Sequence, residues 1–163
     1  MPTTLDQETI AEVLPGSWRV GATNIVDWLD GDRRDPVFRF EVSETTPLAI
    51  SEEQEFTSPE GKSRLITIQS EWVDGVFRSK GRGILKSGAS RWRLGGMSED
   101  RSVLVIRVAT VRGGQDGLLV LVRSDAASGE LRSMIATRSD EFGLGPEDFA
   151  SLSWLDLSAS GGF

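Results

Sequence analysis

Acidic side chains alternate along one stretch of the sequence, in an arrangement that could transfer protons. On a strand, Glu53 and Glu55 share one face, and Glu52, Gln54 and Phe56 share the other. Two carboxyl groups act as acid and base only if burial separates their pKa values. A solvent-exposed face of a sheet explains the alternation better, so we expect no catalytic residue here.

Another charged segment contains carboxylates that a calcium ion could use. Asp30, Asp32 and Asp35 follow one another closely, but the later ligands and the terminal Glu of an EF-hand loop are missing. Arg33 and Arg34 lie among these acids and can pair with them. The sequence therefore predicts a solvent-exposed charged loop and no metal site.

A basic face is expected on a later strand, where Arg78, Lys80 and Arg82 alternate. These side chains can lie opposite the acids of another strand. The glycine-rich pieces 81–83 and 113–114 do not join a strand to a helix as a dinucleotide-binding loop does. We therefore expect barrel corners and a turn there, and no nucleotide cofactor.

The residue types that are missing exclude most of the common catalytic chemistries. The chain contains no His, no Cys and no Tyr, beside 5 Trp and 7 Phe. This composition excludes His-dependent triads, His-ligated haem, Cys and His zinc sites, thiol nucleophiles and disulfides. Carboxylate, Arg, Lys, Ser and Thr remain for chemistry. We expect no cofactor, and a binding protein rather than an enzyme.

The net charge bears on the partners. With 25 acidic against 18 basic residues, the formal net charge is −7, and the isoelectric point is about 4.7. Such a surface repels a phosphate backbone unless the charges segregate sharply, so we expect no nucleic acid as a partner.

Residues 1–8 lack the basic cluster and apolar core of a secretory signal, and no apolar run approaches the about 20 residues of a spanning helix. We expect a cytoplasmic protein without a membrane span; its oligomeric state is open.

The length of 163 residues is that of one domain, 1–163, with a self-sufficient core. Thr4 and Gln7 predict a capping box in front of a short amphipathic helix, which ends at Pro15. From Gly16 onward the apolar period changes to two, which indicates the first strand.

Seven further strand-like runs follow, separated by turn signals. They are 37–43, 47–56, 63–72, 76–85, 90–95, 102–109 and 117–123. Asp74 and Gly75 between two alternating runs are typical of a hairpin turn. Short links between consecutive strands favour an antiparallel meander, and eight such strands can close into a barrel. The predicted fold is all-β, an eight-stranded up-and-down barrel with a short N-terminal helix.

The period returns to helical after Arg123. Ser128 is the expected N-cap of one outer helix of about four turns, whose apolar stripe includes Leu131 and Phe142. Gly143 supplies a left-handed C-terminal residue. A short strand around 152–157 can then add to the sheet.

Strand parity predicts which side chains line the barrel. The inward set is Phe38, Phe40, Leu48, Ile50, Phe56, Ile66, Ile68, Trp92, Leu94, Leu119 and Leu121. An apolar and aromatic lining is typical of a small-molecule pocket, although the same side chains could meet and fill the barrel. Trp28 and Leu29 precede the charged loop, where apolar residues are unusual, and we interpret them as a lid over the barrel mouth.

Two end motifs resemble those of the lipocalins. Gly16, Ser17 and Trp18 are similar to the G-x-W signature of that family, and Arg123 closes the eighth strand before a loop and a helix. In the family the Trp plugs the closed end of the barrel and the Arg packs across it, so the resemblance assigns these roles to Trp18 and Arg123. A guanidinium over an indole face gains about 0.5–2 kcal/mol, which supports the pairing independently.

The resemblance implies that a small hydrophobic or amphipathic ligand binds in the barrel cup. Two alternatives stay open. The barrel could carry an enzyme that uses a carboxylate or an Arg for acid and base chemistry, which a buried titratable side chain inside the cup would favour. A filled barrel could instead act as a protein interaction module, which an exposed apolar patch would favour.

Overall fold

The computed structural model describes residues 5–80, 91–109, 117–126 and 130–155. Its elements in chain order are α1 (Gln7–Val13), β1 (Gly16–Thr23), the 3₁₀ turn η1 (Val26–Trp28), β2 (Arg34–Thr45), β3 (Leu48–Thr57), β4 (Ser63–Val73), β5 (Val76–Lys80), β6 (Arg91–Met97), β7 (Val103–Ala109), β8 (Gly117–Arg123), α2 (Leu131–Thr137), the 3₁₀ turn η2 (Ser139–Phe142), α3 (Pro146–Ser151) and β9 (Ser153–Trp154).

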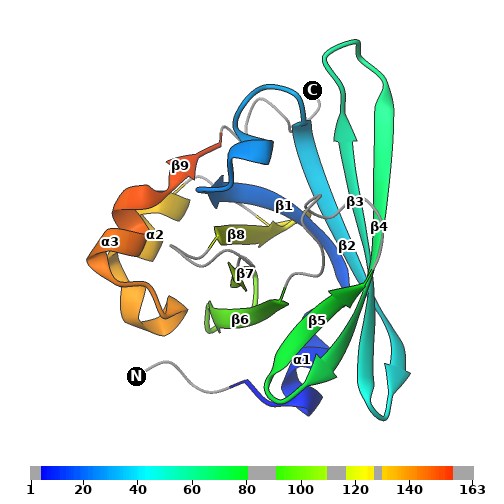
Figure 1. Ribbon diagram of the computed structural model, residues 1–163. Helices are drawn as coiled ribbons and strands as arrows, with labels where there is room; N and C mark the ends of the chain where they lie inside the picture. Colours follow the sequence, from blue (N-terminus) through cyan, green and yellow to red (C-terminus); the bar gives the residue numbers. More distant parts are fainter. Residues whose placement is uncertain (1–4, 81–90, 110–116, 127–129, 156–163) are drawn as a thin grey trace.

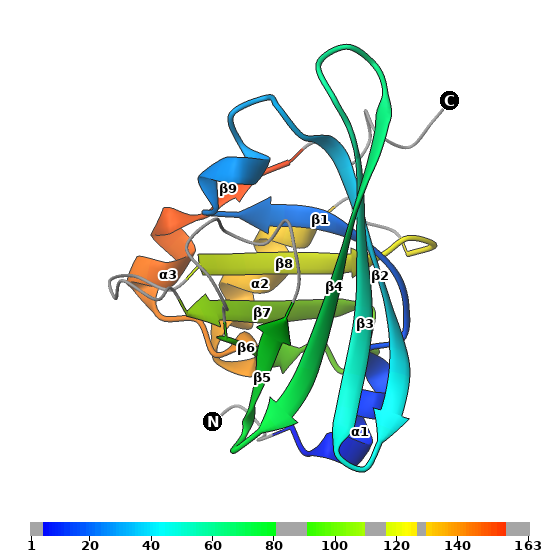
Figure 2. The same ribbon diagram turned by 45° about the vertical axis from the view of Figure 1, so that its right-hand side comes forward.

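The strands form one antiparallel sheet that closes on itself. Each of β1 to β7 pairs with the next strand along the chain, and β8 pairs with β1, so the ring is complete. β9 adds to β1 outside this ring. Figures 1 and 2 show the barrel with α1 at one end and the C-terminal helices along one side. The predicted eight-stranded antiparallel barrel is therefore confirmed.

Successive side chains of a strand point to opposite faces, so the apolar side chains of the barrel form one cluster inside it and one cluster outside it. On β8, Leu119 and Leu121 point into the interior, while Leu118, Val120 and Val122 point outward. The outward residues pack under α2 and η2, against Leu131, Ile135 and Phe142. Both faces of β8 are thus buried, as expected for a strand between a barrel core and a covering helix.

A bulge in β1 changes the parity at its end. The ladder to β8 skips Gly21, so Ala22 leaves the inward face occupied by Trp18 and Val20 and joins the outer cluster. A side chain at Gly21 would collide with Leu131 of α2. The bulge thereby lets the helix approach the sheet closely.

The predicted capping box is wrong. The first helix begins at Gln7, and Asp6 caps it by accepting a hydrogen bond of 2.8 Å from the amide of Thr9. Thr4 lies outside the described residues. The carboxylate of Asp6 takes the position because it reaches the third helical amide directly.

The predicted outer helix is present, but it is shorter than the expected four turns: α2 spans only Leu131–Thr137. The segment forms α2, η2 and α3, and Ser128 lies outside the described residues. η2 packs directly on two glycines of β6: a side chain at Gly96 would collide with the backbone of Glu141 and Phe142. Gly143, at φ 65°, approaches Gly95 so closely that a Cβ would lie 2.7 Å from the Gly95 carbonyl oxygen. In place of one regular helix, the segment under this close packing forms the short helix α2 followed by the 3₁₀ turn η2.

The end of the barrel beside α1 is closed by Trp18. Its indole is fully buried, and its Nε1 donates a hydrogen bond of 2.9 Å to the carbonyl of Leu14. The Arg123 guanidinium lies 4.0 Å from the indole ring and donates to the carbonyls of Pro15 and Val13. Burial lowers the pKa of this guanidinium from its ordinary value. One cation thus satisfies carbonyls that the helix end would otherwise leave without partners.

We predict that Trp18→Ala lowers the free energy of unfolding by about 3–5 kcal/mol, because it leaves a cavity in a fully buried site. Denaturant titration followed by circular dichroism measures the loss. Trp154→Ala is the matched control: this half-buried Trp lies outside the ring, so its replacement costs less. A loss below about 1 kcal/mol for Trp18→Ala would contradict this role.

Candidate functional site

Most of the side chains that parity predicts to face inward lie in the interior cluster. Its buried members include Phe38, Phe40, Leu48, Ile50, Trp92, Leu94, Leu119 and Leu121. Phe56 is half-buried against this cluster. Ile66 and Ile68 belong to neither core cluster, although Ile68 is buried. The predicted lining is thus largely brought together around one interior.

Parity missed several members of the interior cluster. Leu104 and Ile106 point inward, while Val103 and Val105 on the same strand point outward. All four are apolar, so the signal for a face came from Arg107 alone, which shares the parity of the outward Val103 and Val105. Phe77 was also missed, although the charged Arg78 beside it was a usable signal for an inward position.

Aromatic rings line the interior in an unbroken series from one end to the other. Trp28 contacts Phe38 at 5.2 Å between ring centroids, and Phe38 contacts Phe40 at 6.5 Å. Phe40 lies 6.0 Å from Trp92, which stacks on Phe77 at 4.3 Å. Such a wall offers a large apolar surface at little conformational cost.

The two residues interpreted as a lid, Trp28 and Leu29, lie at the end of η1. This turn lies at the opposite end of the barrel from α1 (Figures 1 and 2). Trp28 is buried, with its ring 5.8 Å from Phe56, whereas Leu29 is exposed. The Arg33 guanidinium lies 4.9 Å from the Trp28 ring. A pocket of about 330 Å³ opens beside this segment, lined in part by Leu29 and Leu155.

The charged loop differs from its prediction in one respect. Among the described residues, Arg33 lies over Trp28 and Phe56 and forms no ion pair with the neighbouring aspartates. Asp30 instead accepts a hydrogen bond of 3.0 Å from the amide of Asp32. The described part of the chain contains no cluster of side chains that could hold a metal ion.

Sequence reasoning placed Glu52 on an exposed face, and this is wrong. Glu52 is 6% exposed and lies between Ile50 and Gln54 on the inward face of β3. Directly opposite it stand Phe40 on β2 and Ile68 on β4. The same parity that turns Ile50 inward turns Glu52 inward. Strand parity therefore indicated the inward position, but the prediction followed the charge of the side chain instead. By contrast, Glu55 pairs with Arg39 at 3.6 Å on the outer face.

The Glu52 carboxyl is held by one neighbour on its own strand. Gln54 Nε2 donates a hydrogen bond of 2.5 Å to Glu52 Oε2. Burial raises the pKa of Glu52 from 4.5 to about 7, and the hydrogen bond from Gln54 acts in the opposite direction. A carboxyl in this environment changes its charge near neutral pH.

A second polar group lies beside it in the interior. Trp92 Nε1 donates a hydrogen bond of 2.9 Å to Ser70 Oγ, and the Ser70 and Ser79 hydroxyls are 3.1 Å apart. Ser70 stands opposite Ile50, one inward position along the sheet from Glu52. The aromatic wall therefore contains one polar region, built by β3, β4 and β5.

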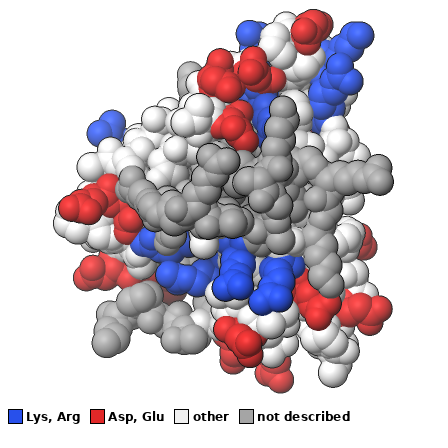
Figure 3. All heavy atoms as spheres, viewed as in Figure 1, with Lys and Arg blue, Asp and Glu red and all other residues white. Residues whose placement is uncertain are grey.

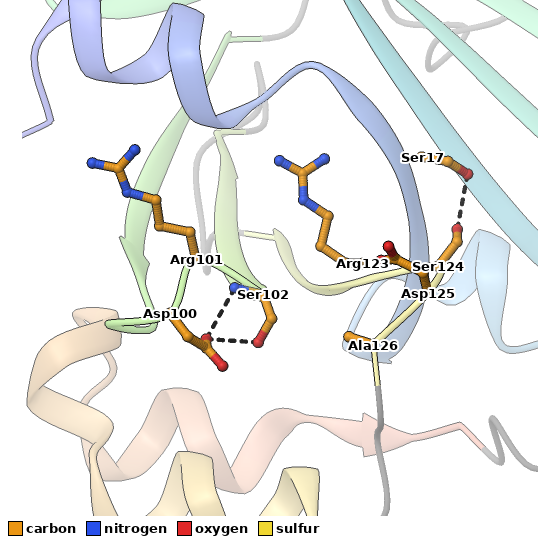
Figure 4. A pocket seen from close by; sticks show the side chains of 8 residues that line it. All are labelled: Ser17, Asp100, Arg101, Ser102, Arg123, Ser124, Asp125 and Ala126. Atoms are coloured by element: carbon orange, nitrogen blue, oxygen red, sulfur yellow. Dashed lines mark hydrogen bonds between the residues drawn. The ribbon is translucent and has the colours of Figure 1, made fainter.

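A larger pocket of about 630 Å³ lies at the closed end of the barrel (Figure 4). Asp100 accepts hydrogen bonds of 3.0 Å from the amide and 2.7 Å from the hydroxyl of Ser102. The hydroxyls of Ser17 and Ser124 are 2.8 Å apart. Asp100 thus bonds to Ser102, and Ser17 bonds to Ser124, so these groups already have partners at an open surface. We therefore place the candidate site in the interior instead.

We predict that Glu52→Gln changes how stability depends on pH. Because the folded-state pKa is raised, the folded protein holds a proton that the unfolded chain releases, so stability falls as pH rises from about 4.5 to about 7. The variant lacks this fall. Relative to the parent it gains about 3 kcal/mol across that window, since one pKa unit is worth about 1.4 kcal/mol. Denaturant titrations at several pH values measure the gain, and Glu53→Gln on the opposite face is the control. Parallel curves for parent and Glu52→Gln would refute the buried position.

Known proteins resemble this chain in structure and not in sequence. No family model and no curated protein sequence matches it. The bovine lipocalin allergen Bos d 2 is 16% identical, with a TM-score of 0.60, over 92% of this chain and 94% of that one. An odorant-binding protein, OBP1, is 11% identical, with a TM-score of 0.59 and coverage of 91% and 94%. Lobster apocrustacyanin A1 is 8% identical, with a TM-score of 0.60 and coverage of 94% and 87%. At these identities the likeness establishes the architecture, and this chain has the lipocalin fold.

Proposed function

We propose that the protein binds a small, mainly apolar molecule inside the barrel, with Glu52 next to the polar group of that molecule. The observation that carries the proposal is a buried carboxyl within a mainly aromatic and aliphatic interior. A buried charge costs free energy unless it is compensated, so a carboxyl that serves only the fold would be replaced at a gain in stability. A ligand that pairs with it supplies a reason for its presence.

The chemistry of Glu52 also limits the ligand. An ionised carboxylate accepts hydrogen bonds and attracts cations, and it repels a second carboxylate. The partner group is therefore an amine or a hydroxyl rather than a carboxylate. The aromatic series from Trp28 to Phe77 provides the surface for an apolar chain or ring. One of the similar structures is named an odorant-binding protein, and that name is consistent with a small apolar ligand.

Trp28 has a gating role in this proposal. Its ring packs on Phe38 and Phe56 at the end of the barrel away from α1, so a ligand passing there has to displace it. None of the helices in the described residues has the length and apolar character of a membrane-spanning helix.

The headgroup preference can be tested with dodecylamine, dodecanol and dodecanoate, which share one apolar chain. At about pH 8, where Glu52 is mostly ionised, we expect the amine to bind about tenfold more tightly than dodecanoate, a difference of about 1.4 kcal/mol. Glu52→Gln should remove this preference, and Glu53→Gln should keep it. Tryptophan fluorescence and native mass spectrometry report the binding, and Trp28→Ala should accelerate it.

Three results would separate the possible interpretations of the barrel. Binding with the expected preference supports the proposal. If the parent and Glu52→Gln both bind all three compounds with equal affinity, the barrel binds apolar molecules but Glu52 does not contact their polar group. A protein that binds none of them, and carries no co-purified molecule, has a filled interior. In that case the exposed apolar residues of the described chain, Val26, Leu29 and Leu65, become the first candidates for a partner surface.

The same carboxyl supports a second function, proton transfer to a bound molecule. A general acid or base works best with a pKa near the working pH, and burial brings that of Glu52 to about 7. Incubation of the protein and its co-purified molecule in heavy water distinguishes the two functions. An enzyme places deuterium on a carbon of that molecule, and Glu52→Gln abolishes the exchange; a binder leaves every carbon-bound hydrogen in place.

A further inference from the structure

Positive charge is concentrated in one part of a chain that is acidic as a whole. The segment 75–98 carries no acidic residue, although the net charge of the protein is −7. Its basic residues are Arg78, Lys80, Arg82, Lys86, Arg91 and Arg93. Basic residues are therefore segregated from acidic ones in the sequence, which is the condition for binding an anionic partner.

The sheet brings arginines from three strands together on its outer face. Arg78 on β5 stands directly opposite Arg91 on β6, and Arg93 on β6 stands directly opposite Arg107 on β7. Figure 3 shows Lys and Arg side chains in a row across this face, with acidic side chains above and below. Like charges in directly opposite positions destabilise a sheet. Glu71 on β4, which also stands opposite Arg78, offsets part of this repulsion.

The four arginines border a pocket of about 350 Å³ between β5 and β6. Among the described residues, the pairs Phe77–Trp92 and Arg78–Arg91 join these two strands, and the pocket lies beside them. Trp92 contributes to its lining together with the apolar side chains of Val73 and Val76 and one acid, Asp74. The pocket thus combines a basic rim with an apolar and aromatic surface.

One of these arginines is held in place by the C-terminal segment. Arg107 donates hydrogen bonds of 2.5 Å to Asp148 of α3 and 2.6 Å to the carbonyl of Gly143. The hydrogen bond from Arg107 lowers the pKa of Asp148, so this pair is ionised at neutral pH. Arg78, Arg91 and Arg93 are exposed, and Glu71 on β4 stands directly opposite Arg78. Three exposed guanidinium groups thus lie beside a fixed fourth.

We propose that this arginine pocket binds the phosphate monoester group of a ligand whose apolar part rests on Trp92 and Val76. A guanidinium donates two parallel hydrogen bonds to a phosphate, and several guanidinium groups match its double charge better than that of a carboxylate. Trp92 is 5% exposed, and the part of it that lines the pocket, together with Val73 and Val76, gives an apolar group a surface to contact. The phosphate can belong to a soluble molecule or to a lipid headgroup, and the site lies outside the barrel interior.

Phenyl phosphate is a suitable probe, because it joins a phosphate monoester to an aromatic ring. Titration of the full chain, followed by calorimetry and tryptophan fluorescence, should show saturable binding that weakens with added salt. Benzyl alcohol, which lacks the charge, should bind much more weakly. The double variant Arg78→Gln/Arg91→Gln should raise the dissociation constant by about tenfold or more. Arg64→Gln on β4 is the control for a lost exposed charge.

A parallel experiment with vesicles identifies the source of the phosphate. Vesicles containing phosphatidic acid are compared with vesicles of phosphatidylcholine alone, using the same variants. Binding of phenyl phosphate alone supports a soluble ligand, and binding of phosphatidic acid vesicles alone supports a lipid headgroup, provided that the double variant loses it. The proposal is overturned if neither probe binds, or if both bind the parent and the double variant equally. Binding of dodecylamine in the interior is measured separately, so the two proposals can fail independently.

Discussion

Closure of the ring through β1 is the constraint on which the rest of this structure depends. β1 has to pair with β2 and with β8 at the same time, and Trp18 stands at the position where it faces Phe38 on one side and Arg123 on the other. A sheet with a free edge would expose its amides and carbonyls, whereas a closed ring satisfies them internally. The indole, the guanidinium and the end of α1 are therefore one packing unit.

Closure creates an interior that is separated from solvent, and this separation changes the chemistry of the groups inside. Glu53 and Glu55 remain ordinary surface acids, while Glu52, their neighbour, is transferred into an aromatic environment that favours its protonated form. Ser70 and Ser79 satisfy one another and the indole of Trp92 in the same region. The barrel thus presents a small polar area on an apolar wall, the usual composition of a site for a small amphipathic molecule.

Trp92 connects the two proposed sites. One part of its ring belongs to the interior, where it stacks on Phe77 and lies near Phe40, and the same residue lines the arginine pocket on the outer side. Its neighbours on β6, Arg91 and Arg93, point to the outer face and border the same pocket.

Much of the architecture could be predicted from the sequence. Alternating apolar residues determined the strands, and at β8 they separated Leu119 and Leu121 from Val120 and Val122, because a period of two assigns each side chain to one face. The pairing of Trp18 with Arg123 was implied by the resemblance of the two end motifs to those of the lipocalins. The tertiary structure decided what alternation does not contain: which face of the apolar run 103–106 is interior, how Gly95 and Gly96 pack against η2, and how deeply the inward-facing Glu52 is buried. These depend on contacts between segments far apart in the chain, and burial of a carboxyl is a property of the closed ring, not of the residues that precede and follow it.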